Sequence, residues 1–147
     1  MLLPLVNLTL SLPHLNDTVQ VGGGIVDQKI AELVIKNGPD RVNDLISLGV
    51  PFDVDENQEL ILRKEAAHEH NRIVSVRGDM TGKKIMEVLT GLVEKSPHIE
   101  IIEGQNAVEL HQENDAVYGV TIQNSVKETY IKSGCIILAT GGIGQLY

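Results

Sequence analysis

The segment Cys135–Ala139 constrains the fold of this chain more than any other, because all of its residues are apolar. A strand that is apolar at every position is buried on both faces, which is typical of parallel sheets covered by helices. Thr140-Gly141-Gly142 follows directly, and glycines at such a junction let the backbone approach a ligand closely. In unrelated proteins the same junction can be only a tight turn. The pattern therefore predicts an α/β fold, with a ligand contact or a turn after the strand.

Helices are predicted in the first third of the chain, where apolar residues recur at spacings of three and four. Asp27 is suited to be the N-cap of a helix over Gln28–Asn37. The tripeptide Asn37-Gly38-Pro39 predicts the end of that helix and the start of a second one, because proline fits the first helical position. Gly49 predicts the end of this second helix.

The residue pattern in the middle of the chain predicts two short strands and a third helix. Leu60–Leu62 and Arg72–Val76 are the predicted strands, on either side of an irregular turn that carries histidines. Either Thr81 or Asp79 is predicted to cap the helix that follows.

The remainder of the chain is predicted to be rich in strands. Asn114-Asp115 and Asn124-Ser125 mark reversals of the chain, so the three strands around them should form an antiparallel β-meander. The strands Ile99–Glu103 and Cys135–Ala139 should lie together in a parallel sheet beside the meander. The meander strands are predicted at Ala107–His111, Val117–Gln123 and Thr129–Lys132.

Charge and cysteine content exclude several classes of partner. The net charge of −8 repels nucleic acid and anionic membrane surfaces. Cys135 is the only cysteine, so an internal disulfide and a multi-cysteine metal site are excluded, and a small core residue is the expected role. A reducing, cytoplasmic location is favoured. The segment Leu2–Leu15 lacks the features of a signal peptide and is too broken to span a bilayer.

Taken together, five segments resemble the L-aspartate oxidase family, in the order and at the spacing of that family. The wider superfamily contains the flavoprotein subunits of succinate dehydrogenase and fumarate reductase, which share the strand-Ala-Thr-Gly-Gly and Asp-x-Thr-Gly elements. Gly49–Asp53 and the neighbourhood of Glu65 and His68 favour the aspartate oxidase branch. The segments are Asp17–Asp27, Gly49–Asp53, Leu62–Ile73, Asp79–Gly82 and Ile137–Tyr147, which resemble D-T-x-x-A-G-x-G-x-x-D, G-V-x-F-D, L-T-R-E-G-G-H-S-x-x-R-I, D-A-T-G and V-L-A-T-G-G-x-G-Q-L-Y.

The resemblance implies an FAD enzyme that oxidises L-aspartate to iminoaspartate, the first step of quinolinate and NAD synthesis. The electrons pass to oxygen or to fumarate. It also implies an α/β FAD-binding domain in which parallel strands, helices and an antiparallel meander combine. The alternative is a flavoprotein of the fumarate reductase or succinate dehydrogenase type.

The resemblance carries several roles to residues of this chain. Glu65 matches the glutamate that orients the substrate ammonium group, and a surface glutamate paired with Lys64 or Arg63 is the alternative. Asn106 and Ala107 match the place that contacts the adenine side of FAD, although Asn106 also suits a turn. The remaining cofactor candidates are Ala139, Thr140, Gly141 and Gly142.

The histidine-bearing loop departs from the family pattern and permits other interpretations. Ala66-Ala67 stand where the family has two glycines, and Arg63 stands where it has threonine, so the loop that carries Glu65 would be misaimed if those glycines need positive φ. His68 and His70 with Arg72 shape the loop under the flavin or partner nearby glutamates. A metal site is the weaker interpretation, because no third ligand lies nearby in sequence.

The match is expected to be partial. Residues 1–16 resemble nothing in the family and are expected to be a leader that is poorly ordered or borrows a non-native partner, while residues 17–147 are expected to form part of the FAD-binding domain. The N-terminal Rossmann βαβ unit with G-x-G-x-x-G, and the capping domain, have no counterpart. The chain is therefore expected to hold FAD weakly and to be inactive alone. It is either a fragment that self-associates through exposed edges or a non-catalytic module that needs a partner chain.

Overall fold

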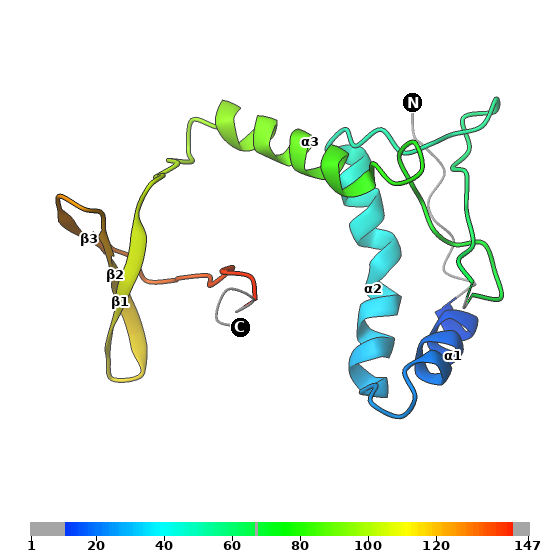
Figure 1. Ribbon diagram of the computed structural model, residues 1–147, viewed down its shortest axis with the longest axis horizontal. Helices are drawn as coiled ribbons and strands as arrows, with labels where there is room; N and C mark the ends of the chain where they lie inside the picture. Colours follow the sequence, from blue (N-terminus) through cyan, green and yellow to red (C-terminus); the bar gives the residue numbers. More distant parts are fainter. Residues whose placement is uncertain (1–10, 67, 143–147) are drawn as a thin grey trace. The chain divides into compact units, whose positions relative to one another are not determined.

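The computed structural model of the chain describes residues 11–66 and 68–142 and divides into two compact units, Met1–Ile99 and Glu100–Tyr147 (Figure 1). Among the described residues, the first unit contains three helices and the second a three-stranded antiparallel sheet. The helices are α1 (Ser11–Val21), α2 (Gln28–Ser47) and α3 (Thr81–Lys95), and the strands are β1 (Asn106–Glu113), β2 (Ala116–Gln123) and β3 (Glu128–Lys132).

The helix α1 crosses the boundary that the sequence predicts between residues 16 and 17. Leu15 and Asp17 are both buried on this helix, whereas Leu12 is 66% exposed. Residues 11–16 therefore belong to a helix, and the assignment of residues 1–16 to a leader outside the family domain stays a prediction. Residues 1–10 lie outside the described residues.

The helix α2 is continuous where two helices were predicted. Asp27 is its N-cap, as predicted, and the Asp27 Oδ1 atom accepts hydrogen bonds from the backbone N–H groups of Lys29 at 3.0 Å and Ile30 at 3.2 Å. Pro39 lies inside the helix. The break at Asn37-Gly38-Pro39 is therefore a wrong prediction. Packing of the residues after the proline against the core outweighs the local cost of a missing N–H group.

The core of the first unit is small and lies where α2, α3 and the intervening loops meet. Its buried residues are Val50, Phe52 and Val76. The predicted strands at Leu60–Leu62 and Arg72–Val76 contribute only isolated antiparallel bridges, Val54↔Leu60 and Arg63↔Ile73. Partly buried apolar residues complete the core: Val42, Leu45, Ile46, Leu60, Val74, Ile85 and Val88.

The helix α3 begins at Thr81, but neither predicted residue caps it with its side chain. Met80 occupies the N-cap position and makes no side-chain cap hydrogen bond. The Thr81 Oγ1 atom instead accepts a hydrogen bond from the backbone N–H of Val76 at 3.0 Å. The hydroxyl therefore fastens the preceding loop to the helix.

The sheet of the second unit confirms the predicted meander, in the order β1-β2-β3 with antiparallel pairing. Asn114 and Asp115 have φ angles of 49° and 61°. Two consecutive positive φ angles define the two-residue hairpin turn that best matches the twist of the strands. At the second reversal, Asn124 Oδ1 accepts hydrogen bonds from the backbone N–H groups of Val126 and Lys127, each at 2.9 Å.

The two predicted parallel strands are absent from the described residues. Ile99–Glu103 and Cys135–Ala139 have no strand assignment, and Ile137 and Leu138 are exposed. The prediction of a buried parallel strand is therefore wrong for this structure. A parallel strand needs a hydrogen-bonded neighbour and cover on both faces, and no described residue forms a ladder with either segment. The absence of a Rossmann unit stays a prediction.

No helix among the described residues combines the length and apolarity that a membrane crossing requires.

Truncation of Phe52 tests the core of the first unit. We expect Phe52→Ala to lower the free energy of unfolding by about 3 kcal/mol, because a buried phenyl ring is lost and a cavity is left. Ile25 is 92% exposed, so Ile25→Ala should change the free energy by less than about 0.5 kcal/mol. Urea denaturation followed by far-UV circular dichroism measures both. Equal losses in the two variants would contradict this core assignment.

Candidate functional site

Glu65 lies on a loop whose base is closed by the bridge between Arg63 and Ile73. The Arg63 N–H donates to the Ile73 carbonyl at 2.8 Å, and the Ile73 N–H donates back at 3.0 Å. Within the loop, the His68 N–H donates to the Glu65 carbonyl at 3.0 Å. The side chain of Glu65 is exposed. Its carboxylate is therefore open to solvent and to a cationic ligand.

The loop keeps an ordinary backbone at the first of its two alanines. Ala66 is not among the described non-glycine residues with positive φ, so the alanine in place of the family glycine causes no left-handed strain there. Ala67 lies outside the described residues.

A buried ion pair fastens this loop to α1. The Asp17 Oδ2 atom accepts a hydrogen bond from Arg72 Nη2 at 2.5 Å and one from the Glu69 backbone N–H at 3.2 Å. The side chains of Asp17 and Arg72 are each only 8% exposed. The hydrogen bond from Arg72 is the main reason that the pKa of the Asp17 carboxyl lies below its ordinary value of 3.8.

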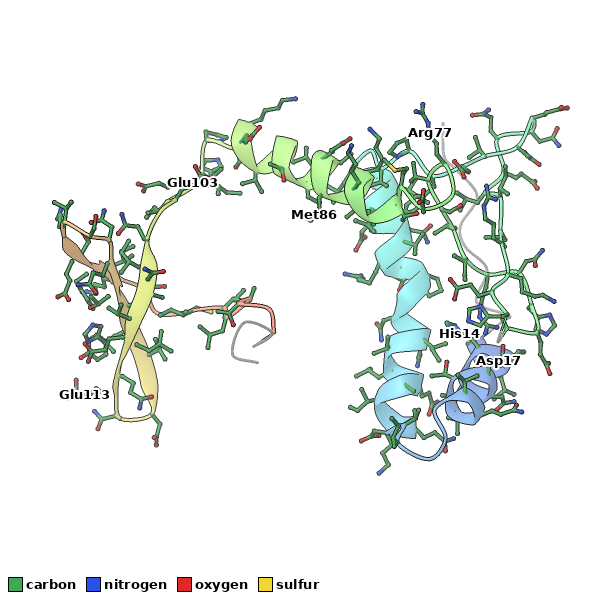
Figure 2. The ribbon with its side chains drawn as sticks, in the orientation of Figure 1. His14, Asp17, Arg77, Met86, Glu103 and Glu113 are labelled. Carbon is green, nitrogen blue, oxygen red and sulfur yellow. The ribbon has the colours of Figure 1, made fainter. Side chains whose placement is uncertain are left out.

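Two histidines stand beside the ion pair. His14 and Asp17 lie on α1 (Figure 2), and the rings of His14 and His68 meet edge to face with centroids 6.1 Å apart. Burial lowers the pKa of His14 below 6.5, and the nearby charges of Arg72 and His68 lower it further. His14 is therefore suited to remain neutral at pH 7.

The cluster has unused hydrogen-bonding capacity but no metal-ligand geometry. Within residues 11–66 and 68–142, His68 Nδ1 and two nitrogens of Arg72, Nε and Nη1, are buried without a hydrogen-bond partner. In the same residues no group of three histidine, cysteine, aspartate or glutamate side chains is placed to hold a metal ion. The arrangement of His68 and Arg72 instead resembles a structural anchor beneath the loop.

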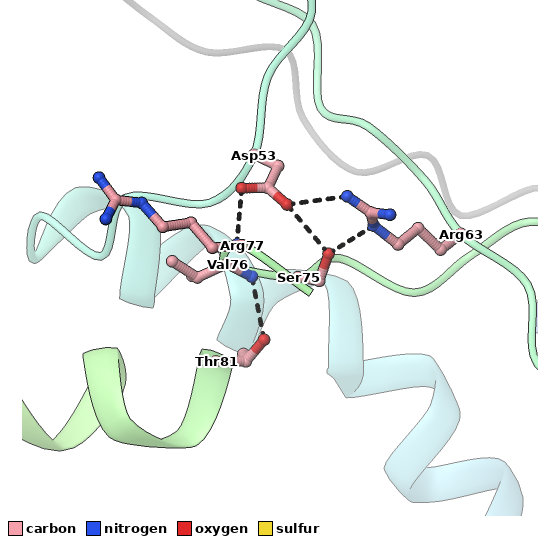
Figure 3. Close-up of polar contacts among 6 residues, drawn as sticks. All are labelled: Asp53, Arg63, Ser75, Val76, Arg77 and Thr81. Atoms are coloured by element: carbon pink, nitrogen blue, oxygen red, sulfur yellow. Dashed lines mark hydrogen bonds and ion pairs between the residues drawn. The ribbon is translucent and has the colours of Figure 1, made fainter. Parts of the chain in front are cut away.

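A second polar network joins three loops around Asp53 (Figure 3). The Asp53 Oδ2 atom accepts from Arg63 Nη2 at 3.1 Å and from Ser75 Oγ at 3.2 Å. Its Oδ1 atom accepts from the Arg77 backbone N–H at 2.9 Å. Arg63 Nε also donates to Ser75 Oγ at 2.7 Å. The base of the Glu65 loop is thereby tied to the buried residues Phe52 and Val76, which adjoin the network in sequence.

The same contacts set the charge state of Asp53. The Arg77 N–H makes the largest contribution to a pKa below 3.8, and Arg63 and Ser75 lower it further. Sequence reasoning missed this network and considered Arg63 as a departure from a family pattern and as a possible partner of Glu65. The signal available was the opposite charge of Asp53 and Arg63, but a distance of ten residues across an irregular loop follows no periodic rule.

The second unit carries the other candidate residues. Asn106 and Ala107 begin β1, opposite Gln123 and Ile122 of β2, and both are exposed. Residues 139–142 are exposed and have no regular secondary structure. The structure therefore groups these six residues in one unit and places Glu65 in the other.

The segment Thr140–Gly142 contains a glycine with a left-handed backbone. Gly141 has a φ angle of +72°, and a Cβ atom added at Gly141 or Gly142 would meet no atom of the described residues within 4 Å. Its backbone is thus bare, and a flat or phosphorylated group has room to approach. The residues present fit the flank of a dinucleotide such as FAD.

Cys135 is exposed, and the prediction of a small buried core residue is wrong. The backbone of Cys135 instead exchanges hydrogen bonds with the Ser133 hydroxyl, which donates to the Cys135 carbonyl at 2.6 Å.

Comparison with known families and proteins places this chain among flavoproteins. The family described as FAD binding domain matches residues 12–147. The chain is 40% identical over 134 residues to an L-aspartate oxidase of Xylella fastidiosa, and 38% identical over 135 residues to one of Caulobacter vibrioides. Each alignment covers 91% of this chain and 26% of the relative. The chain thus spans about a quarter of the length of these relatives.

Two solved structures have a similar fold. The Mycobacterium smegmatis Sdh1 complex matches with a TM-score of 0.80 at 25% identity, over 92% of this chain and 25% of that chain. Quinol fumarate reductase FrdA of E. coli matches with a TM-score of 0.81 at 20% identity, over 93% and 24%. The second likeness concerns the fold alone.

Replacement of Asp17 tests the buried ion pair through its pH dependence. A carboxyl whose pKa is lowered on folding adds stability above its unfolded pKa, and this stability is lost as the pH falls through the folded pKa. We therefore expect Asp17→Asn to lower the free energy of unfolding at pH 7. The difference from the unchanged chain should shrink as the pH falls below 3.8.

Asp44 provides the matched control, because it forms an exposed ion pair with Arg41 at 2.9 Å. Asp44→Asn should change stability little at any pH, since exposed pairs contribute little. Urea denaturation at a series of pH values measures both variants. A loss in Asp17→Asn that does not vary with pH would contradict an ionised Asp17 in the folded chain.

Proposed function

Because this chain belongs to the FAD binding domain family, we propose that it works within a flavoenzyme that oxidises L-aspartate to iminoaspartate. The sequence relation to L-aspartate oxidases, 40% identity over 134 residues, is the observation that carries the proposal. FAD is the cofactor of the family. The reaction would supply quinolinate and NAD synthesis, with oxygen or fumarate as the electron acceptor.

The packing of the first unit supports this assignment. Polar contacts join three of the five segments that resemble the L-aspartate oxidase family. The pair Asp17–Arg72 joins Asp17–Asp27 to Leu62–Ile73, and the pair Asp53–Arg63 joins Gly49–Asp53 to the same loop. These three segments therefore share a structural task, which is to hold the Glu65 loop, although Arg63 itself departs from the family pattern.

In this proposal the second unit holds one flank of FAD. Asn106 and Ala107 offer a small, exposed strand end for the adenine side, and residues 139–142 offer a bare backbone with a left-handed glycine. When bound, FAD supplies the acceptor for the hydride that leaves the substrate. The acidic chain, with its net charge of −8, adds no general attraction for the pyrophosphate.

Glu65 is proposed to orient the substrate. Its exposed carboxylate can accept charge-assisted hydrogen bonds from the ammonium group of L-aspartate. The anchors at Arg63 and Arg72, on either side of the loop, restrict how far the carboxylate can move. Such restriction is what a positioning group needs, because misplacement of a substrate is costly to the rate.

A flavoprotein of the succinate dehydrogenase or fumarate reductase type is the second candidate. The TM-score of 0.80 to the Mycobacterium smegmatis Sdh1 complex favours it. The lower sequence identity, 25% against 40%, makes it the weaker one. In either case we propose a small carboxylic acid as substrate, a cytoplasmic location, and no direct contact with nucleic acid or lipid. A non-catalytic module that joins a partner chain is a further alternative.

A chimaera tests the proposed function. Residues 12–147 replace the matching segment of the Xylella fastidiosa L-aspartate oxidase, and the same exchange is made in quinol fumarate reductase FrdA of E. coli. We expect bound flavin and L-aspartate-dependent peroxide release only from the first host, with kcat/KM within about tenfold of that host. The flavin content of each purified chimaera controls for folding. The proposal would be contradicted if the chimaera in the Xylella fastidiosa host bound flavin but showed no turnover, while the chimaera in the E. coli host was active.

The isolated chain of 147 residues is expected to show no turnover, because the activity belongs to relatives of which the aligned part of this chain covers only 26%. Flavin fluorescence and peroxide release, with FAD and L-aspartate added, measure this. Saturable flavin binding at micromolar concentration together with aspartate-dependent peroxide would contradict the expectation.

Glu65→Gln in the first chimaera tests the positioning role. We expect the KM for L-aspartate to rise about tenfold, because a neutral amide weakens the bond to the ammonium group. Glu69→Gln is the matched control on the same loop, since Glu69 contacts Asp17 through its backbone N–H and not its side chain. Steady-state kinetics measure both. Equal effects would assign Glu65 a general electrostatic role only.

A further inference from the structure

The outer edge of β3 has backbone groups that face away from the sheet. In an antiparallel ladder, residues that bond to one neighbour alternate with residues that face the other side. The Ser133 N–H donates to the Tyr118 carbonyl at 2.9 Å and the Asn124 N–H donates to the Lys127 carbonyl at 3.1 Å, in the register of β2 and β3. Residues 129 and 131 therefore bond to β2, whereas the N–H and C=O groups of Glu128, Tyr130 and Lys132 point outward. In the described part of the chain no strand pairs with this edge.

The charges along this edge are complementary to those of an inverted copy, because the two ends of the strand carry opposite charges. Glu128 and Lys132 lie at equal distances on either side of Tyr130. When two antiparallel copies of β3 are aligned with Tyr130 at the centre, each Glu128 lies opposite Lys132 of the second copy. Glu128, Tyr130 and Lys132, which this alignment pairs with one another, are also the residues whose backbone groups face outward. Backbone pairing and charge pairing thus select one and the same register.

From these two observations we infer that the outer edge of β3 binds a second copy of this chain, in an antiparallel β3–β3 pair centred on Tyr130. Each of the three facing pairs exchanges two backbone hydrogen bonds, as in any antiparallel sheet. The two Glu128–Lys132 contacts are new ion pairs, because neither residue has an ion-pair partner among the described residues. The two three-stranded sheets then form one continuous sheet. This inference is independent of the proposed function.

Tyr130 is held in place before the second copy arrives. Its hydroxyl donates to the Tyr118 carbonyl at 3.1 Å. Its ring covers Gly119, where an added Cβ atom would lie only 2.4 Å from the ring. Half of the side chain remains exposed. A fixed, half-exposed aromatic ring loses little conformational entropy on association, which favours a contact at the centre of the pair.

The opposite edge of the sheet is a poorer site for self-association. The charged residues of β1 are Glu109 and Glu113, with no lysine or arginine to face them in a second copy. Its pairing with β2 is also interrupted by two register shifts, between Ala107 and Glu109 and between His111 and Gln112. Bulges and unmatched charges are features that block edge-to-edge pairing. On β3, Lys132 would face Glu128 of a second copy, so its charge opposes pairing with other strands but not pairing with that copy.

Sedimentation equilibrium of the full 147-residue chain at low ionic strength tests the inference. A pair of five-residue strands is a small contact, so we expect a weak dimer whose fraction grows with concentration. Glu128→Lys alone and Lys132→Glu alone should each raise the dissociation constant by about tenfold or more, because two attractive pairs become repulsive.

Recombining the charges gives the decisive controls. In an equimolar mixture of the Glu128→Lys and Lys132→Glu chains, both cross-strand pairs have opposite charges again, so a heterodimer should form at the concentrations where the unchanged chain dimerises. The double variant Glu128→Lys/Lys132→Glu, which has the composition and net charge of the unchanged chain, should also dimerise. Far-UV circular dichroism confirms that each variant keeps its sheet.

Three results would overturn the inference. One is an unchanged chain that stays monomeric at every accessible concentration. Another is a pair of single variants that associate as well as the unchanged chain. The third is a mixture that associates no better than its two components, which would show that β3 contacts another surface.

Discussion

The first unit depends on the buried ion pair between Asp17 and Arg72. Two charges removed from water are costly, and a buried pair is tolerated only when further hydrogen bonds satisfy it. The Glu69 N–H supplies one such bond to Asp17, whereas Nε and Nη1 of Arg72 have no hydrogen-bond partner among the described residues. The pair joins α1 to a loop that lies 55 residues later in the chain. Without it, the Glu65 loop would be fixed only at its base, by the bridge between Arg63 and Ile73.

The polar networks around Asp17 and Asp53 hold much of the first unit together because its apolar core is small. Only one phenylalanine is present in the chain, and it is one of the three buried residues of the core. The Asp53 network surrounds this core on its loop side and involves Ser75, which is itself buried. Carboxylates that accept hydrogen bonds from several N–H or O–H donors fix a loop in one geometry more selectively than apolar contacts do. Both networks include an arginine of the Leu62–Ile73 segment, which carries Glu65.

The parts of the fold that the sequence predicts correctly are those with local causes. Asp27 caps α2 through its own neighbours, and Asn114-Asp115 adopts the positive φ angles of a hairpin turn, so the helix start and the meander follow from short-range rules. Pro39 was misinterpreted because packing of distant residues overrides a local helix breaker. Cys135–Ala139 was misinterpreted because the pairing of a parallel strand depends on residues far away in sequence. The ion pairs of Asp17 and Asp53 join segments that are separated by irregular loops, and no periodic pattern in the sequence predicts such contacts.

The sheet of the second unit has two edges with different chemistry, and the candidate functions divide between them. The order β1-β2-β3 places Asn106 and Ala107 on one edge and the outward groups of Tyr130 on the other. A second copy paired through β3 would therefore leave the start of β1 uncovered. Cofactor contact at one edge and self-association at the other are compatible in a single molecule. The bulges and glutamates that keep β1 from pairing also keep that edge free for a small ligand.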